Sequence, residues 1–238
     1  EQAYMEALAQ SLIAGHAVLA AGGSSIDAVI AAIAEMEDCP LFNAGKGSVF
    51  THDGRNELEA SIMEGSTRAA GAVAGVTTIC NPIRAAHAVM TKSAHVMLIG
   101  EGAEIFAAEQ GLEIVDPSYF YTQYRWNQLQ KAIAKDSILR DHDAGLNTLP
   151  GEDEKHGTVG AVALDRYGNL AAGTSTGGLT NKHSGRVGDS STIGPGTYAD
   201  NRSVTVSTSG TGEMFIRTAA AFNTAAQVQL LRIPITEG

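Results

Sequence analysis

Segments with helical periodicity and segments with strand periodicity alternate along both halves of the chain, and this alternation restricts the fold more than any other feature of the sequence. Apolar residues recur at helical spacing in five segments, which are 3–21, 27–37, 82–92, 101–110 and 212–226. Short apolar runs bounded by turn residues predict strands at 58–63, 71–79, 95–99, 158–165, 170–176 and 203–209. The chain is therefore expected to form a mixed fold of α-helices and β-strands.

Turn and cap residues predict where these elements begin and end. Gly22 is suited to close the first helix, and Ser25 is predicted to cap the second. Asn81-Pro82 supplies the N-cap and first-turn residues of the third helix. A Gly-Asn turn divides the small-residue stretch 158–176 into two apolar runs, and this pattern predicts a β-hairpin.

Composition limits the partners that the chain can have. The 238 residues are enough for one sizeable core, and the net charge of -10 with a pI near 5.1 argues against a nucleic-acid or anionic-membrane surface. Glycine occurs 27 times and aromatic residues make up only 5%, which favours close approaches between packed layers. The composition therefore predicts that neither nucleic acid nor a membrane is a partner of this chain.

The chain has only two cysteines, Cys39 and Cys80, which is too few for a disulfide framework and lacks the paired spacing of a zinc site. Both are predicted to be buried as small apolar side chains. No apolar run approaches the roughly 18 residues of a membrane span, and residues 1–5 do not resemble a signal peptide. These features predict a cytoplasmic protein.

Other motifs carry less chemistry. Glu57 and Glu59 are predicted to lie on one face of a solvated strand edge, which weighs against a glycosidase carboxylate pair. The glycine-rich run 71–75 lacks the lysine that a phosphate-binding loop requires. Histidines without metal-site spacing are read as structural or exposed, and no organic cofactor is predicted. These histidines include His52, His87, His95, His142 and His183.

The junction at Thr158 is the most informative point of the sequence. A charge-rich stretch at 141–157, expected to be a surface loop or linker, runs directly into a small-residue strand that begins with Thr158. If the preceding peptide bond is broken, the threonine hydroxyl lies beside a free α-amine that can act as its general base, with a pKa near ~8. By itself the pattern also fits a structural threonine at a strand start.

Several motifs occur together in a characteristic order. They are LFNAG at 41–45, GAVAGV at 71–76, HGTVGAVA at 156–163, TSTGG at 174–178 and GRVGDS at 185–190. Over residues 5–222 the chain resembles the plant-type L-asparaginase/isoaspartyl peptidase family of N-terminal nucleophile hydrolases. The resemblance implies one structural domain, a four-layer αββα sandwich, cleaved into an α subunit (1–157) and a β subunit (158–238). It also implies a homodimer of cleaved αβ units.

The resemblance assigns roles in the chemistry. Thr158 corresponds to the nucleophile, which is released by intramolecular cleavage after Gly157. Thr176 corresponds to a threonine whose hydroxyl contacts the nucleophile and its amine. Ser209 and Gly210 correspond to the oxyanion donors, with Ser209 standing where the family usually has threonine. Either residue type offers a hydroxyl donor at this position.

The resemblance also assigns a substrate-binding set. Arg186 corresponds to the guanidinium that holds the substrate α-carboxylate, and Asp189 to the partner of the α-ammonium group. Without the resemblance, an Arg and an Asp three residues apart could equally form a surface salt bridge. Asn43 could likewise be a structural residue of a turn. The remaining residues that the family pattern places around the substrate are Val187, Gly188, Thr211, Gly212 and Asn43.

The loop at 36–46 resembles one that binds a structural sodium ion through backbone carbonyls. The expected ligands are Met36, Glu37, Cys39, Phe42, Ala44 and Lys46. The family pattern also has an opening His-Gly-Gly-Ala-Gly strand and further strands after residue 222, so we expect the sandwich to lack its terminal strands here.

The expected activity is hydrolysis of β-aspartyl dipeptides and L-asparagine through a β-aspartyl-enzyme ester. The alternatives are a glycosylasparaginase, against which the two distant cysteines speak, and an uncleaved, inactive homologue that acts as a binding protein.

Overall fold

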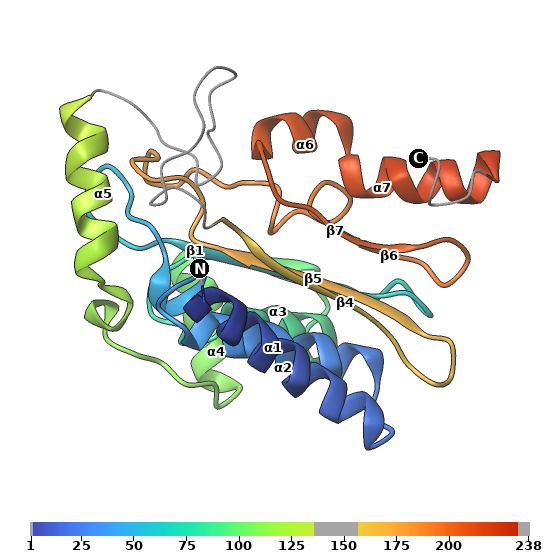
Figure 1. Cartoon of the computed structure of the whole chain (residues 1–238). Coiled ribbons are helices and arrows are strands. Elements are labelled where there is room, and N and C mark those ends of the chain that lie inside the picture. Colours follow the sequence, from blue (N-terminus) through green and yellow to red (C-terminus); the bar gives the residue numbers. More distant parts are fainter. Residues whose placement is uncertain (1, 136–156, 233–238) are drawn as a thin grey trace.

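The computed structural model describes residues 2–135 and 157–232 (Figure 1). Its main sheet has five strands, namely β1 (Leu58–Glu64), β2 (Ala70–Val76), β3 (Met97–Ile99), β4 (Val159–Leu164) and β5 (Leu170–Thr176). The strand order is β3-β2-β1-β5-β4, and every pair is antiparallel except β2 with β3. The predicted hairpin is confirmed as β4 and β5. Because β1 pairs with both β2 and β5, the two halves of the chain share one sheet.

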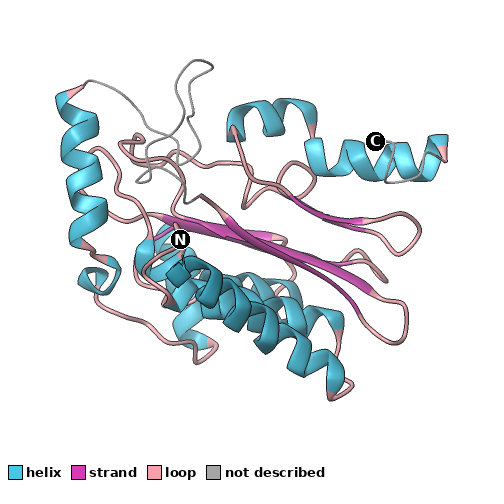
Figure 2. Cartoon of the chain, in the orientation of Figure 1, coloured by secondary structure: helices cyan, strands magenta, loops and turns pink. Residues whose placement is uncertain are grey.

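Four helices cover one face of this sheet (Figures 1 and 2). They are α1 (Gln2–Ala20), α2 (Ser25–Asp38), α3 (Pro82–Lys92) and α4 (Gly100–Glu109). Leu58, Ala60 and Ile62 alternate along β1 and are fully buried in the core with residues of α2 and α3. A Cβ on Gly173 of β5 would lie 2.7 Å from a methyl group of Val29. Small residues in the sheet therefore let the helices pack closely.

The opposite face of the main sheet carries a second, two-stranded antiparallel sheet (Figure 2). It consists of β6 (Thr197–Ala199) and β7 (Thr205–Ser207), with α6 (Gly212–Thr218) and α7 (Ala220–Ala226) lying outside it (Figure 1). The hydroxyl of Ser61 on β1 lies 2.7 Å from the Thr197 hydroxyl, within hydrogen-bonding distance. This face of the main sheet is therefore lined with polar groups near β6 and β7.

A fifth helix, α5 (Gln123–Ala134), lies beside the sheet in the region for which the sequence predicted no regular element. Arg125 is 1% exposed, and its Nε donates to the Gly47 carbonyl at 2.8 Å. The rings of Phe50 and Trp126 meet edge to face at 5.4 Å. The aromatic residues of this segment thus attach α5 to the 41–50 loop. The predicted linker at 141–157 lies outside the described residues, apart from Gly157.

The mixed α and β fold is confirmed, with four local corrections. The N-cap of α2 is Ser24, whose hydroxyl accepts the Asp27 N–H, and not Ser25. The predicted helix at 212–226 is divided because Ala219 adopts φ +48°. The predicted strand at 95–99 is confined to the edge strand β3 at Met97–Ile99, where Ile99 is 65% exposed. Cys80 is buried as predicted, whereas Cys39 is only half-buried. In the part of the chain that the structure describes, no helix is both long and apolar enough to cross a bilayer.

Candidate active site

The β4–β5 hairpin brings Thr158 and Thr176 together. Val159 pairs with Ser175 across the hairpin, so the residues one step further along, Thr158 and Thr176, face each other at its open end. The Thr158 hydroxyl donates to the Thr176 hydroxyl at 3.1 Å. Thr158 is half-buried and Thr176 is 2% exposed. The hairpin register therefore positions the predicted nucleophile directly beside its predicted partner.

Asn43 fixes the backbone next to this threonine pair. Its side-chain Nδ2 donates to the Gly178 carbonyl at 2.8 Å, and its own carbonyl accepts the Gly177 N–H at 3.0 Å. The Gly178 N–H in turn donates to the Thr176 hydroxyl at 3.0 Å. Asn43 also accepts the Val49 N–H, so it acts in its own loop as well. It joins the 41–50 loop to the end of β5.

Arg186 and Asp189 converge on Gly212. A Cβ on Gly212 would lie 2.7 Å from Arg186 Nη2 and 2.9 Å from Asp189 Oδ1. The absence of a side chain therefore leaves both charged groups facing one small space. Arg186 also contacts Glu213 at 3.0 Å, while the Thr208 hydroxyl donates to Asp189 at 3.0 Å. The spacing of Arg186 and Asp189 also fitted a surface salt bridge between these two residues. The salt bridge of Arg186 is made with Glu213 instead.

Burial shapes the electrostatics of Asp189. Its side chain is 5% exposed, and this burial raises the pKa of the carboxyl group. The hydrogen bond from Thr208 and the nearby charge of Arg186 oppose the shift, because both favour the ionised form. An ammonium group placed beside Asp189 would likewise favour ionisation.

A small cavity lies next to Thr158. It has a volume of about 230 Å³ and is lined by Thr158, Gly160, Ala161, Val162, Ser207, Thr208 and Ser209. The predicted oxyanion donor Ser209 therefore borders the space into which Thr158 opens. Gly210 follows it, where a Cβ would lie 2.9 Å from Cζ of the Phe215 ring, and Thr211 is the N-cap residue of α6. Val187 lies in the Arg186–Asp189 segment and is 38% exposed.

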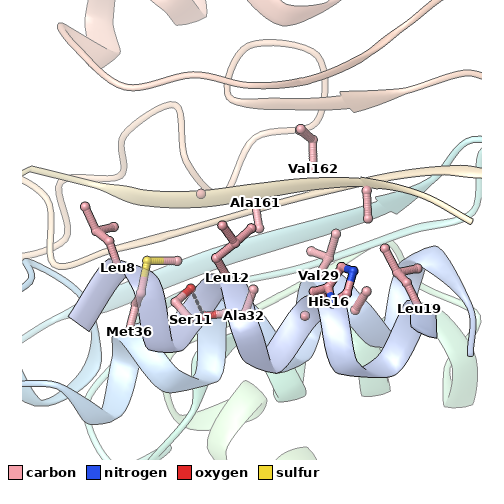
Figure 3. A pocket seen from close by; sticks show the side chains of 14 residues that line it. Leu8, Ser11, Leu12, His16, Leu19, Val29, Ala32, Met36, Ala161 and Val162 are labelled. Atoms are coloured by element: carbon pink, nitrogen blue, oxygen red, sulfur yellow. Dashed lines mark hydrogen bonds between the residues drawn. The ribbon is translucent and has the colours of Figure 1, made fainter. Parts of the chain in front are cut away.

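A larger, apolar groove runs between α1 and β4 (Figure 3). Leu8, Leu12, His16 and Leu19 of α1 face the strand residues 160–163 across it. Its lining residues include no carboxylate and no arginine, and Thr158 is not among them. The candidate site lies at the smaller cavity instead, because Thr158 and Ser209 line that cavity and its residue Thr208 contacts the Asp189 carboxylate at 3.0 Å.

Residues 36–46, which are the end of α2 and the loop that follows it, bring their backbone segments close together. A Cβ on Gly45 would collide with the Glu37 carbonyl, and one on Gly47 would collide with the Phe42 carbonyl. Ligation by carbonyl oxygens alone would suit a hard cation such as sodium. The Glu37 side chain serves the core instead, since burial raises its pKa to about 8 and its Oε1 accepts the Ser175 hydroxyl at 2.6 Å. No group of three His, Cys, Asp or Glu side chains suited to a metal occurs among residues 2–135 and 157–232.

The prediction for Glu57 and Glu59 was wrong. They do not form a solvated edge, because β1 is the central strand, and the two residues are 8% and 2% exposed. Both carboxylates accept backbone N–H groups of the segment that carries Arg186 and Asp189. Lys182, which sequence reasoning also missed, is 2% exposed and donates to the Glu57 carbonyl at 2.9 Å. Charged residues at alternating positions of a central strand were the available indication of this cluster.

These features define the class. The chain is a hydrolase candidate in which a threonine at a strand start faces a second threonine and borders a small cavity, and an Arg–Asp pair is linked to that cavity through Thr208. A family model described as asparaginase matches residues 1–234. The chain belongs to the asparaginase family.

Relatives with assigned activities support this membership over most of the chain. The isoaspartyl peptidase of Salmonella typhimurium is 51% identical over 230 residues, which cover 96% of this chain and 72% of that protein. The isoaspartyl peptidase of Escherichia coli is 53% identical over 227 residues, covering 95% and 70%. The isoaspartyl peptidase/L-asparaginase of Rattus norvegicus is 45% identical over 212 residues, covering 89% and 61%.

Proposed function

We propose that this protein is a threonine amidohydrolase that hydrolyses β-aspartyl dipeptides and L-asparagine to L-aspartate. The observation that carries the proposal is the 3.1 Å contact between the Thr158 and Thr176 hydroxyls at the mouth of a small cavity. The names of the relatives supply the substrate class. The Arg–Asp pair at Gly212 offers charges that match the α-carboxylate and α-ammonium of an aspartyl group.

The enzyme first cleaves itself. The Thr158 hydroxyl attacks the carbonyl carbon of Gly157, the C–N bond breaks, and the threonine nitrogen takes the proton. Water then hydrolyses the resulting ester, which leaves residues 1–157 and 158–238 as separate subunits. They stay together because β5 of the second remains paired with β1 of the first.

The freed amine then activates the hydroxyl. With a pKa near ~8 it is partly neutral at physiological pH and accepts the Oγ proton as the hydroxyl attacks the substrate side-chain carbonyl. The Ser209 hydroxyl and the Gly210 N–H hold the oxyanion, and each such donor contributes about 3 kcal/mol. Ammonia or an amino acid leaves with a proton, and water hydrolyses the β-aspartyl ester.

The substrate is held at its aspartyl end. The planar fork of Arg186 binds the α-carboxylate with two parallel hydrogen bonds. Asp189 and the Gly212 carbonyl hold the α-ammonium group, while Val187, Gly188 and Thr211 enclose the same end. Asn43 lines the nucleophile pocket through its contacts with Gly177 and Gly178.

The wider assembly follows the same proposal. The order of helices, main sheet, small sheet and helices supports a four-layer αββα sandwich. In the proposed protein, residues 36–46 bind a structural sodium ion through backbone carbonyls. Two cleaved αβ units form a dimer in the cytoplasm. No organic cofactor takes part.

The test is hydrolysis of L-asparagine and of β-Asp-Leu by the purified protein, with Thr158→Ala as the matched control. The proposal predicts release of L-aspartate from both substrates by the unsubstituted protein and none by the variant. Release by Thr158→Ala would refute the assignment of the nucleophile. Turnover of glycan-linked asparagine alone would favour a glycosylasparaginase, and no turnover at all would favour a binding protein.

A further inference from the structure

Three polar residues on one face of the β1 segment contact the segment that carries Arg186 and Asp189. Glu57, Glu59 and Ser61 alternate along the chain, so their side chains point to the same side of the sheet. They are 8%, 2% and 0% exposed. Buried polar groups persist in a strand only when they are satisfied by hydrogen bonds, and here their partners lie in residues 185–197.

Glu59 makes the central contacts. Its two carboxylate oxygens accept the Gly188 N–H at 3.1 and 2.9 Å, and Oε2 also accepts the Ser191 hydroxyl at 2.9 Å. Glu59 pairs with Thr176 across β1 and β5, so both side chains point toward the same face. The Glu59–Thr176 pair therefore connects Thr176, the partner of the nucleophile, with the segment that carries Arg186 and Asp189.

The neighbouring polar residues hold the two ends of this segment. Glu57 Oε2 accepts the Gly185 N–H at 2.8 Å, and the Ser61 hydroxyl donates to the Ser190 carbonyl at 2.6 Å. The contacts from β1 reach the backbone just before Arg186, between Arg186 and Asp189, and just after Asp189. Because they engage main-chain groups, they determine the path of the segment while leaving both charged side chains to other partners.

Charge also favours this arrangement. A Cβ on Gly188 would lie 2.8 Å from Glu59 Oε1 and 2.9 Å from Arg186 Nη1, so the carboxylate and the guanidinium approach the same point. Glu59 and Glu57 also stabilise the charged form of the buried Lys182. A buried carboxylate between two cations costs less to desolvate than an isolated one.

We propose that Glu59 is a positioning residue for substrate recognition, which fixes Gly188 so that Arg186 and Asp189 converge at Gly212. The proposal rests on the proposed function, in which this pair holds the aspartyl end of the substrate. Glu59 does not touch the substrate. It acts through the backbone at Gly188, and its loss therefore loosens the grip on the α-carboxylate and α-ammonium while leaving Thr158 and Thr176 in place.

The test compares Glu59→Gln with Glu64→Gln, a control on the same strand whose carboxylate accepts the hydroxyl of the nearby Thr67 at 2.8 Å. The amide replaces one acceptor oxygen by a donor, which opposes the Gly188 N–H and the Ser191 hydroxyl. We expect Glu59→Gln to raise KM for L-asparagine at least tenfold with kcat within threefold. Equal KM values for the two variants would overturn the proposal.

A second variant and a second measurement keep the test decisive. If Glu59→Gln does not fold, Ser191→Ala retains the carboxylate and removes one of its contacts, and KM should rise threefold or more with kcat unchanged. Amide exchange of residues 186–191 should be faster in Glu59→Gln than in Glu64→Gln, whether or not the protein is active. An inactive unsubstituted protein would refute the proposed function, whereas unchanged exchange would refute the role of Glu59.

Discussion

Replacing Thr176 with valine tests the geometry of the site because the change keeps the shape of the side chain and removes one hydroxyl. That hydroxyl accepts from Thr158 at 3.1 Å and from the Gly178 N–H at 3.0 Å, and the residue is 2% exposed. Loss of an acceptor for a buried N–H costs about 1–3 kcal/mol of stability. Loss of the positioned contact to the nucleophile should remove about 3 kcal/mol of transition-state stabilisation. This loss corresponds to roughly a 100-fold fall in kcat.

The matched control is Thr174→Val, on the same strand and the same face. Thr174 is fully buried, and its hydroxyl contacts Thr197 of β6 at 2.6 Å and Ser207 of β7 at 2.7 Å rather than Thr158. Both variants should lose stability, by about 2–4 °C in Tm for each kcal/mol. Only Thr176→Val should also lose about 100-fold in kcat.

The assay is ammonia release from L-asparagine, normalised to the amount of free Thr158 N-terminus determined by mass spectrometry. This normalisation separates slow self-cleavage from slow turnover. If kcat of Thr176→Val, corrected in this way, stayed within threefold of Thr174→Val, the reasoning that links the 3.1 Å contact to catalysis would be refuted.

Three further predictions concern the substrate-binding groups. Gly212→Ala should lower kcat/KM about 100-fold, because the new Cβ would lie 2.7 Å from Arg186 Nη2 and 2.9 Å from Asp189 Oδ1. The circular dichroism spectrum should show that the variant still folds. An unchanged kcat/KM would contradict the convergence of Arg186 and Asp189 at Gly212. Arg186→Lys should raise KM roughly tenfold or more with a smaller change in kcat, since lysine cannot form the bidentate fork; an unchanged KM in steady-state kinetics would refute the carboxylate role. Burial raises the pKa of Asp189, and protonation removes the charge of its carboxylate. Competitive inhibition by L-aspartate should therefore weaken as the pH falls. This weakening should begin at a pH above the ordinary Asp pKa of about 3.9. The Asp189→Asn variant should bind L-aspartate weakly at every pH tested. If inhibition of this variant by L-aspartate still changed with pH, the titrating group would be a residue other than Asp189.

The hairpin and the residues at its open end could be predicted from the sequence because their geometry is local. Small apolar residues around a Gly-Asn turn determine the register of β4 and β5, and the register alone brings Thr158 to Thr176. The Arg186 and Asp189 pair was predicted through the family motif. Their convergence at Gly212, which is distant in sequence, is visible only in the structure.

The errors arose where tertiary contacts overrode local pattern. Glu57 and Glu59 resemble a solvated strand edge in sequence, but β1 lies between β2 and β5, and both carboxylates satisfy backbone N–H groups more than 120 residues away in sequence. The predicted helix at 212–226 has continuous helical periodicity, yet Ala219 adopts a left-handed conformation that no local residue type predicts.

Denaturing mass spectrometry of the purified full chain, beside Thr158→Ala prepared in the same way, tests the central claim most directly. We expect two fragments that meet between Gly157 and Thr158 in the unsubstituted protein and one intact species in the variant. A single uncut chain that still hydrolyses L-asparagine would contradict it, because the Thr158 nitrogen would then be an amide and unable to accept the hydroxyl proton.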